Sequence, residues 1–294
     1  MTTAADPAPP APPAPGPFTQ RWRRAARARG PLCLGVAPST KWLRAWRLPD
    51  TLAGARRYCE ITLAAAGDGL AGFRLQVPFF LRFGAAGLDL LAWYAGQVRR
   101  AGGLTLVDAK VGDADDTMDS YAGLYLGPDS VVGGDAVTAH AFLGLGSLEP
   151  LFSHATRTGT GVLVLVRTSN HAAGGLQGAR SRSGRTLAET LAGDLTRWAE
   201  GSGLGPASPA GAVVGARPPE SGDLVAKLPY GVLELPGLGR TGRSTAEVVE
   251  PAREAWQRAM FPITTGILRH GPDLPALRAA LAAARADLYQ ALHH

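Results

Sequence analysis

Residues 104–113 read Leu-Thr-Leu-Val-Asp-Ala-Lys-Val-Gly-Asp, and this stretch holds the pattern on which the fold prediction rests. Its first four residues are typical of a short buried strand. Charged residues and a glycine follow them at once, as expected where a strand gives way to a loop. A longer stretch with amphipathic, helical spacing comes next. The segment therefore predicts one strand–loop–helix unit.

The same unit recurs along the chain. Short apolar runs are each followed by a Gly, Pro or Asp turn and then by a longer amphipathic stretch, such as 88–100 or 187–200. Strands that alternate with helices form a parallel sheet, because each crossover returns the chain to the same edge. Eight units in about 260 residues predict an α/β fold, a single closed (β/α)8 TIM barrel ending in a helix over 274–292, with a doubly wound open sheet as the alternative. The apolar runs are residues 32–36, 72–77, 104–107, 136–138, 161–166, 211–214, 231–235 and 259–263.

The amino-terminal segment differs in composition from the rest. Residues 1–17 read MTTAADPAPPAPPAPGP and contain seven prolines, which is typical of a disordered or polyproline-like tail. Arginines then crowd a short helical stretch around Trp22, for which we expect a solvated helix laid across the base of the fold. We therefore predict a tail over 1–17 and a barrel over 18–294.

Composition excludes several classes of protein. With 46% hydrophobic and 18% charged residues in 294, the chain can bury a large core and is not a largely disordered protein. No apolar run is long enough to cross a bilayer and no secretory signal is visible, so we predict a cytoplasmic protein without a membrane partner. The net charge of +6 comes without a recognisable binding motif, so we predict no nucleic-acid partner.

The sequence offers few ligands for a metal. Cys33 and Cys59 are too few for a disulfide framework or for a tetrahedral zinc site by themselves. Cys33 lies in an apolar run and reads as a buried small residue rather than a nucleophile. His140 and His171 follow predicted strands, but no third ligand stands at a suitable spacing. We predict no metal site.

The charged residues after the third predicted strand are the most informative cluster. Residues two apart on a strand point to the same face, so Asp108 and Lys110 should share one face. A neighbouring carboxylate keeps a lysine protonated and can hold it as a positioned acid. The alternative is a salt bridge that only ties the strand end to its loop. The residues alone leave both interpretations open.

At this point the sequence resembles a known family. The stretch VDAKVGD at 107–113, followed by TMDSYAGLYLGPDS at 117–130, is similar to the longer bacterial type of orotidine 5′-phosphate decarboxylase. The resemblance continues in FFLRFG at 79–84, FLGLGSLEP at 142–150 and PGLG at 236–239. It covers roughly residues 30 to 290 in order. The chain is therefore identified as a member of this family.

The resemblance implies a dimeric (β/α)8 barrel that needs no metal and no organic cofactor. It implies that the first aspartate of the motif, here Asp108, presses against the substrate carboxylate, and that Lys110 protonates the carbon that loses carbon dioxide. It implies that Asp113 reaches into the site of the other subunit. The turn at Ser169 would face the pyrimidine ring.

The chain also departs from the family pattern. The family has an aspartate in its strand 1 motif where this chain has Ala37, and a lysine in its strand 2 motif where this chain has Arg74. The arginine inside the family motif is Val111 here. By register, the phosphate-binding glutamine and arginine become Thr241 and Gly266. The nearby Arg240 and Arg243 could rebuild an anion site or could be solvated loop residues.

These features predict a cofactor-free lyase that decarboxylates, or performs a related carbanion step on, a pyrimidine nucleoside or nucleotide-like substrate in a specialised pathway. The alternative is a catalytically silent nucleotide-binding paralogue. An aldolase with Lys110 as a Schiff base is a third hypothesis, disfavoured because neighbouring aspartates keep the lysine charged. The predicted catalytic residues are Asp108, Lys110, Asp113 and Arg74. The predicted substrate-binding residues are Gln76, Thr117, Ser169, Asn170, His140, Gly239, Arg240 and Arg243.

Overall fold

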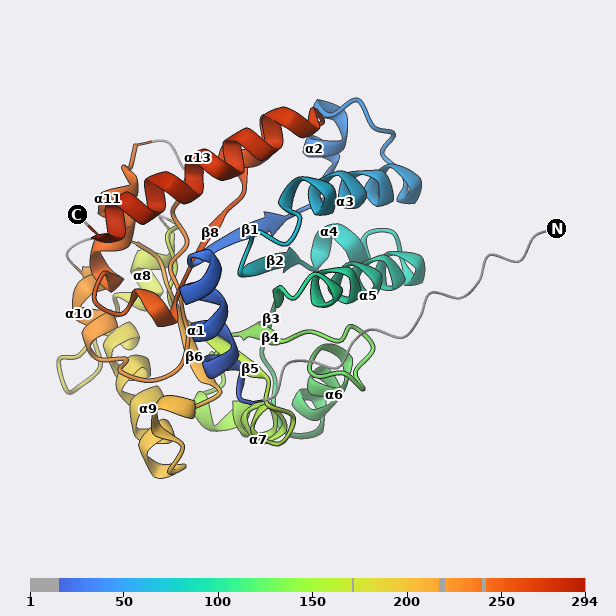
Figure 1. Cartoon of the computed structure of the whole chain (residues 1–294). Helices are drawn as coiled ribbons and strands as arrows, with labels where there is room; N and C mark the ends of the chain where they lie inside the picture. Colours follow the sequence, from blue (N-terminus) through green and yellow to red (C-terminus); the bar gives the residue numbers. More distant parts are fainter. Residues whose placement is uncertain (1–15, 171, 217–219, 240–241, 294) are drawn as a thin grey trace.

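The computed structural model describes residues 16–170, 172–216, 220–239 and 242–293 and has one closed sheet (Figure 1). Eight parallel strands pair in sequence order, and β1 closes the barrel by pairing with β8. The predicted single (β/α)8 barrel is therefore confirmed. The strands are β1 Leu32–Val36, β2 Gly72–Gln76, β3 Leu104–Val111, β4 Ala136–Ala139, β5 Gly161–Arg167, β6 Ala210–Val214, β7 Leu233–Glu234 and β8 Ala259–Ile263.

Helices form the outer layer around this sheet (Figure 1). No helix in the described ranges is long and apolar enough to cross a membrane. The helices are α1 Phe18–Arg29, α2 Thr40–Ala45, α3 Leu52–Ala66, α4 Pro78–Leu81, α5 Ala85–Arg100, α6 Asp115–Tyr125, α7 Glu149–Thr158, α8 Ala173–Gln177, α9 Leu187–Gly201, α10 Glu220–Ala226, α11 Thr245–Val249, α12 Thr265–Leu268 and α13 Leu274–His293. Single turns of 3-10 helix at Leu145–Leu148, Gly205–Ala207, Glu250–Ala252 and Trp256–Arg258 complete the connections.

The predicted strands agree with the structure apart from a few ends. β1 and β8 have the predicted bounds, whereas β3 extends four residues further than its apolar run, to Val111. Polar residues can continue β3 because the carboxyl end of a barrel strand opens toward the site instead of the core. By contrast, β7 is shorter than its apolar run and covers only Leu233–Glu234 of residues 231–235.

Helix α1 closes the amino ends of the strands (Figure 1). Trp22 is fully buried, donates from its indole Nε1 to the carbonyl oxygen of Ala259 at 3.0 Å, and packs so closely on Gly72 that a Cβ there would lie 2.6 Å from its ring. Phe18 excludes a side chain at Gly161 in the same way. The helix predicted across the base is thus present, with one face solvated and the other sealing the barrel.

The buried side chains divide into two clusters. One lies between the strands and the outer helices, and the other fills the barrel interior above α1. Cys33 belongs to the interior cluster and Cys59 to the outer one, and neither forms a disulfide. Burial raises the pKa of both thiols, so they remain neutral and act as small apolar side chains, as expected for Cys33.

A buried ion pair fastens α1 to the barrel. Arg21 pairs with Asp135, and the other oxygen of Asp135 accepts from the backbone N–H of Thr105 at 2.9 Å. We expect Asp135→Asn to lower the free energy of unfolding by about 3–5 kcal/mol, because it leaves a buried guanidinium without its counter-charge. Chemical denaturation would measure this. A loss below about 1 kcal/mol, the size typical of an exposed pair, would contradict it.

Candidate active site

Asp108 lies at the centre of a cluster of charged side chains near the carboxyl end of β3. Its side chain is only 3% exposed and holds three partners. Lys110 Nζ lies 2.5 Å from Oδ1, Thr138 Oγ1 donates to the same oxygen at 2.9 Å, and Arg74 Nη2 lies 2.7 Å from Oδ2. Since a buried charge is stable only when paired, these contacts offset the cost of burying the Asp108 side chain.

The contact between Lys110 and Asp108 was predicted from strand alternation, but a different local geometry produces it. The pairing of β3 with β4 shifts between Val107 and Val111, and Lys110 has a φ of +50°. A lysine rarely adopts this left-handed conformation, which therefore marks local strain. Thr138 stabilises it by accepting from the Lys110 backbone N–H at 2.9 Å. The irregular strand end thus holds the Lys110 side chain, 48% exposed, beside the buried Asp108.

Arg74 joins Asp108 to a carboxylate that the sequence analysis missed. Arg74 Nε lies 2.7 Å from Oε1 of Glu234, which is completely buried at the end of β7. The angle does not allow a hydrogen bond, and neither oxygen of Glu234 accepts one within the described part of the chain. A lone glutamate in the otherwise apolar run 231–235 was the signal that could have revealed it.

The charges in this cluster influence one another. Burial raises the pKa of Glu234; Arg74 and Lys110 oppose that shift, and Asp108 adds to it. Burial alone would lower the pKa of Arg74, but Glu234 and Asp108 outweigh it and raise that pKa above its ordinary value. Arg74 is therefore a permanent cation that cannot donate a proton at neutral pH. Among these groups, Lys110 is the one suited to proton donation.

A cavity of about 350 Å³ adjoins this cluster at the carboxyl ends of the strands. Arg74 and Gln76 of β2 line it, together with Ala37 and Lys41 after β1 and Thr264 after β8. The volume is in the range of small-molecule sites. Lys41 is a cation at this cavity that the sequence analysis did not select. Arg74 and Gln76 thus line this cavity, whereas Asp108 and Lys110 do not line it and are linked to it through the contact of Asp108 with Arg74.

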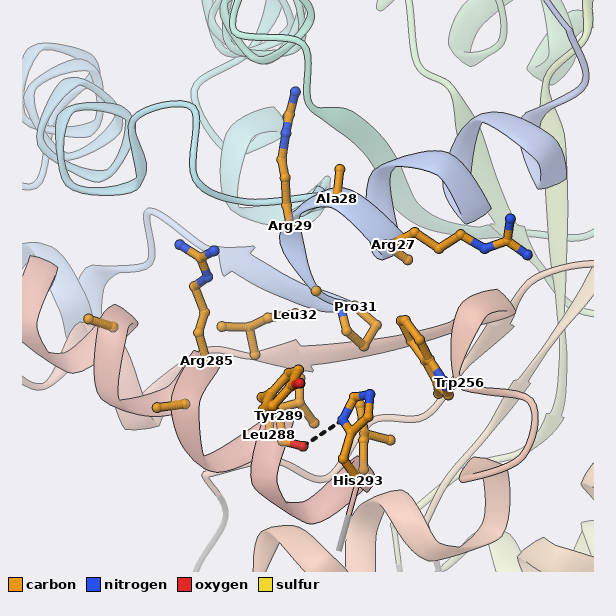
Figure 2. Close-up of a pocket in the computed structure, with 15 residues that line it drawn as sticks. Arg27, Ala28, Arg29, Pro31, Leu32, Trp256, Arg285, Leu288, Tyr289 and His293 are labelled. Atoms are coloured by element: carbon orange, nitrogen blue, oxygen red, sulfur yellow. Dashed lines mark hydrogen bonds between the residues drawn. The ribbon is translucent and has the colours of Figure 1, made fainter.

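A second cavity, of about 560 Å³, lies at the opposite end of the barrel, between α1 and α13 (Figure 2). Trp256, Tyr289 and His293 gather on one side of it, whereas Arg29 points away from them. Arg29 is engaged elsewhere, donating to the carbonyl oxygens of Leu70 and Gly102. This cavity contains no carboxylate–lysine pair. The charged cluster around Asp108 adjoins the smaller cavity, through Arg74.

Asp113 and Thr117 lie beyond β3, at the start of α6, and both are exposed. The contacts of Asp113 are local: its Oδ1 accepts from the backbone N–H of Ala114 at 2.9 Å, and its own N–H points at the sulfur of Met118. Neither residue lines the cavity described above. Within one chain, Asp113 and Thr117 therefore stand apart from the charged cluster.

His140 lies next to the loop that carries Asp113 but faces another cavity. Its ring packs on Gly112, where a Cβ would lie 2.1 Å from the ring, so the glycine of the motif is required by this contact. His140 lines a more apolar cavity of about 410 Å³, together with Phe142 and Leu176. His140 therefore lies away from the cavity beside Arg74, and its role in substrate binding stays a prediction.

The predicted Ser-Asn turn follows β5. Thr168 Oγ1 donates to Asn170 Oδ1 at 2.6 Å, and Gln177 of α8 donates from its amide to Thr168 Oγ1 at 3.0 Å. The backbone of Ser169 approaches Gly215 so closely that a Cβ there would lie 2.7 Å from it. These contacts fix the turn, while neither Ser169 nor Asn170 lines the cavity beside Arg74.

The residues predicted for phosphate binding are placed only in part. Gly239, with a φ of +67°, packs against Gly266, and the two glycines allow the loops after β7 and β8 to approach closely. Arg243 lies just before α11 and is partly exposed. Arg240, Thr241 and His171, like residues 1–15 of the tail, lie outside the described residues.

The arrangement can perform one kind of chemistry with its own side chains. The carboxylate of Asp108 can repel a carboxylate of a bound molecule, and the lysine beside it can give a proton to the carbon from which that carboxylate leaves as carbon dioxide. The part of the chain described by the structure offers no group of three His, Cys, Asp or Glu side chains that could hold a metal ion. Fold and site together define the class of protein: a (β/α)8 barrel lyase that uses its own acidic and basic side chains.

Comparison with known sequences then identifies the family. The pattern of the orotidine 5′-phosphate decarboxylase / HUMPS family matches residues 31–247. The chain belongs to this family, whose decarboxylases are carbon–carbon lyases. The resemblance seen in the motifs is thereby confirmed.

Relatives match along nearly their whole length. An orotidine 5′-phosphate decarboxylase from Salinispora arenicola is 38% identical over 275 residues, covering 94% of this chain and 98% of the relative. One from Streptomyces coelicolor is also 38% identical, covering 90% and 94%. A crystal structure described as an orotidine 5′-phosphate decarboxylase from Streptomyces avermitilis has a TM-score of 0.88 at 36% identity, covering 96% and 98%. The match therefore includes the whole barrel.

Proposed function

We propose that this chain is a cofactor-free decarboxylase acting on a pyrimidine nucleoside or nucleotide-like substrate. The observation that carries the proposal is the pair formed by the buried Asp108 and Lys110 Nζ, 2.5 Å apart, which Arg74 links to the lining of a cavity. The relatives named above are orotidine 5′-phosphate decarboxylases, which makes orotidine 5′-phosphate the first substrate to test.

In this proposal the bond between the pyrimidine ring carbon and its carboxylate breaks, and the electron pair remains on the ring carbon. Asp108 lies against the substrate carboxylate and destabilises it, while carbon dioxide leaves. Lys110 transfers a proton from Nζ to the carbanion. Arg74 keeps the positive charge that the family places on the other side of Asp108. Only interactions that strengthen toward the transition state accelerate the step.

The proposal includes a homodimer in the cytoplasm with shared active sites. Asp113 is exposed, and its hydrogen bonds among the described residues stay within its own loop and α6, which supports a role for its carboxylate in the site of a second copy. Thr117, one helical turn further on, would accompany it. Ser169, Asn170 and His140 would contact substrate from the loops after β5 and β4, and Gly239 with Arg240 and Arg243 from the loop after β7.

The proposal also concerns which pyrimidine nucleoside or nucleotide is the substrate. Ala37 lines the cavity where the family resemblance calls for a carboxylate on the ribose, and Lys41 adds a cation near that point. This change favours a substrate modified at the ribose or its phosphate, in a specialised pathway, over ordinary synthesis of uridine monophosphate. Affinity for a remote phosphate supplies binding energy for catalysis, so its loss is measurable.

The test is release of carbon dioxide from orotidine 5′-phosphate and from orotidine, compared at high enzyme concentration. We expect turnover with both, and a ratio of kcat/KM below about 10-fold in favour of the phosphate, because the phosphate loop is altered. A ratio above about 10³ would show an intact phosphate site and a housekeeping enzyme. Release from neither would contradict ordinary orotidine chemistry.

Binding without turnover is the second candidate function. It is favoured by the loss of a carboxylate at Ala37, which removes a substrate contact while Asp108 stays paired with its cations. Saturable binding of uridine 5′-monophosphate, with no release of carbon dioxide from either substrate, would identify this case. It would make the chain a nucleotide-binding paralogue.

A further inference from the structure

We propose that Arg74 and Glu234 act as one unit, in which Glu234 is a positioning residue that holds the Arg74 guanidinium against Asp108 and cancels its charge. It follows that lysine cannot replace Arg74 while Glu234 remains. This inference rests on the proposed function for its effect on turnover. Its effect on folding and on nucleotide binding does not depend on turnover.

The fold brings the two side chains together across the barrel. β2 and β7 are separated by β8 and β1 in the closed sheet. Arg74 pairs in register with Gly35 of β1, which has no side chain and already approaches Thr264 closely. Thr264 occupies the space that a Gly35 side chain would take, since a Cβ there would lie 1.9 Å from its Oγ1. The Arg74 side chain reaches Glu234 from β2, with its Nε 2.7 Å from Oε1.

Burial makes the pair interdependent. The side chain of Arg74 is 16% exposed and that of Glu234 is 0% exposed, while their atoms Nε and Oε1 lie 2.7 Å apart. A buried carboxylate without a counter-charge is strongly destabilising. Asp108 is a second anion in the same cluster, so removing Arg74 would leave two carboxylates facing Lys110 alone. Glu234 thus requires a cation at Arg74.

The guanidinium is suited to this position because it faces the two carboxylates with two different nitrogens. Arg74 uses Nη2 toward Asp108 and Nε toward Glu234. Lysine has a single ammonium at its tip and no donor along its chain. A lysine at this position would have to face both carboxylates with one nitrogen, whereas Arg74 faces each of them with a separate nitrogen. We therefore expect the family lysine alone to compensate the two carboxylates less well than Arg74 does.

A double-mutant cycle tests this dependence. We compare the intact protein with Arg74→Lys, Glu234→Gln and the double variant, by thermal unfolding, by affinity for uridine 5′-monophosphate and by kcat and KM with orotidine 5′-phosphate. We expect Arg74→Lys to reduce kcat/KM by about 10-fold or more in the intact background and less than about 3-fold beside Glu234→Gln. Equal losses in both backgrounds would overturn the proposal.

The pH profile separates positioning from mere packing. The charged and titratable groups facing Glu234 are Arg74, Asp108, Lys110 and Cys33. Because burial raises the pKa of Glu234, falling pH neutralises it before an ordinary glutamate and releases Arg74. We expect an acid-side fall in kcat that Glu234→Gln removes, since glutamine mimics the neutral form, with KM changed less than about 3-fold. An unchanged acid limb would overturn the proposal.

Asp135→Asn is the matched control, because Asp135 also pairs with a buried arginine but lies at the opposite end of the barrel. It should lower the unfolding temperature and leave the acid limb unchanged. The single variant Arg74→Lys could fail to fold. In that case, folding of the double variant with Glu234→Gln would support the proposal, and failure of the double variant to fold would overturn it. If the intact protein releases no carbon dioxide, the proposed function fails, while unfolding and nucleotide affinity still decide the coupling.

Discussion

Replacing Lys110 by alanine is expected to reduce kcat for carbon dioxide release by about 10²- to 10⁴-fold, the range for loss of a positioned general acid. Nζ of Lys110 lies 2.5 Å from Asp108, and Arg74, the other cation of the cluster, cannot give up a proton at neutral pH. Single-turnover measurements on orotidine 5′-phosphate would isolate the chemical step. They would also expose any activity from a contaminating host enzyme.

Folding should survive this substitution. The Lys110 side chain is about half exposed, and alanine carries the same Cβ, so the strained φ of +50° costs both residues alike. Arg74 and Thr138 remain to pair with Asp108. Lys110→Ala with more than a tenth of the original kcat would show that another group supplies the proton. A loss of folding would instead be visible as a changed unfolding transition.

Mixing two inactive variants is expected to restore activity if Asp113 serves the site of a second copy. In a mixed dimer of Lys110→Ala and Asp113→Ala chains, one of the two sites would contain both intact residues. Random pairing of equal amounts would then return about a quarter of the original activity, since half of the dimers are mixed and one site in each is intact. The assay is carbon dioxide release after exchange of subunits.

The control is a mixture of Lys110→Ala with Asp108→Asn. Both residues belong to the same cluster of one chain, so no pairing assembles an intact site and no activity should return. No recovery with Asp113→Ala either would place this exposed carboxylate outside the chemistry. Full activity of Asp113→Ala by itself would lead to the same conclusion.

Much of the fold could be predicted from the sequence because strand and helix periodicities are local. The eight apolar runs, the α13 region and the amphipathic stretch of α9 (residues 187–201) all correspond to observed elements. The predicted and observed strand ends differ where the run of apolar residues and the pairing of the strands do not coincide. β3 continues through polar residues to Val111, and β7 is limited to the residues that pair with both neighbours.

The charged cluster was predicted only in part, because two of its features depend on non-local geometry. The contact of Lys110 with Asp108 was expected, although an irregular strand end and not regular alternation creates it. Glu234 was missed because a single charge in a short strand gives no sign of which partner lies across the barrel. Its partner Arg74 is 160 residues away in the sequence, and only barrel closure joins them.

The seal formed by α1 has a consequence for the passage of small molecules. Phe18 and Trp22 fill the amino end of the barrel, so a ligand beside Arg74 reaches bulk water through the carboxyl end. Substrate would then enter and product would leave through the same opening at the carboxyl end of the barrel. The product would therefore have to dissociate before the next substrate molecule could bind.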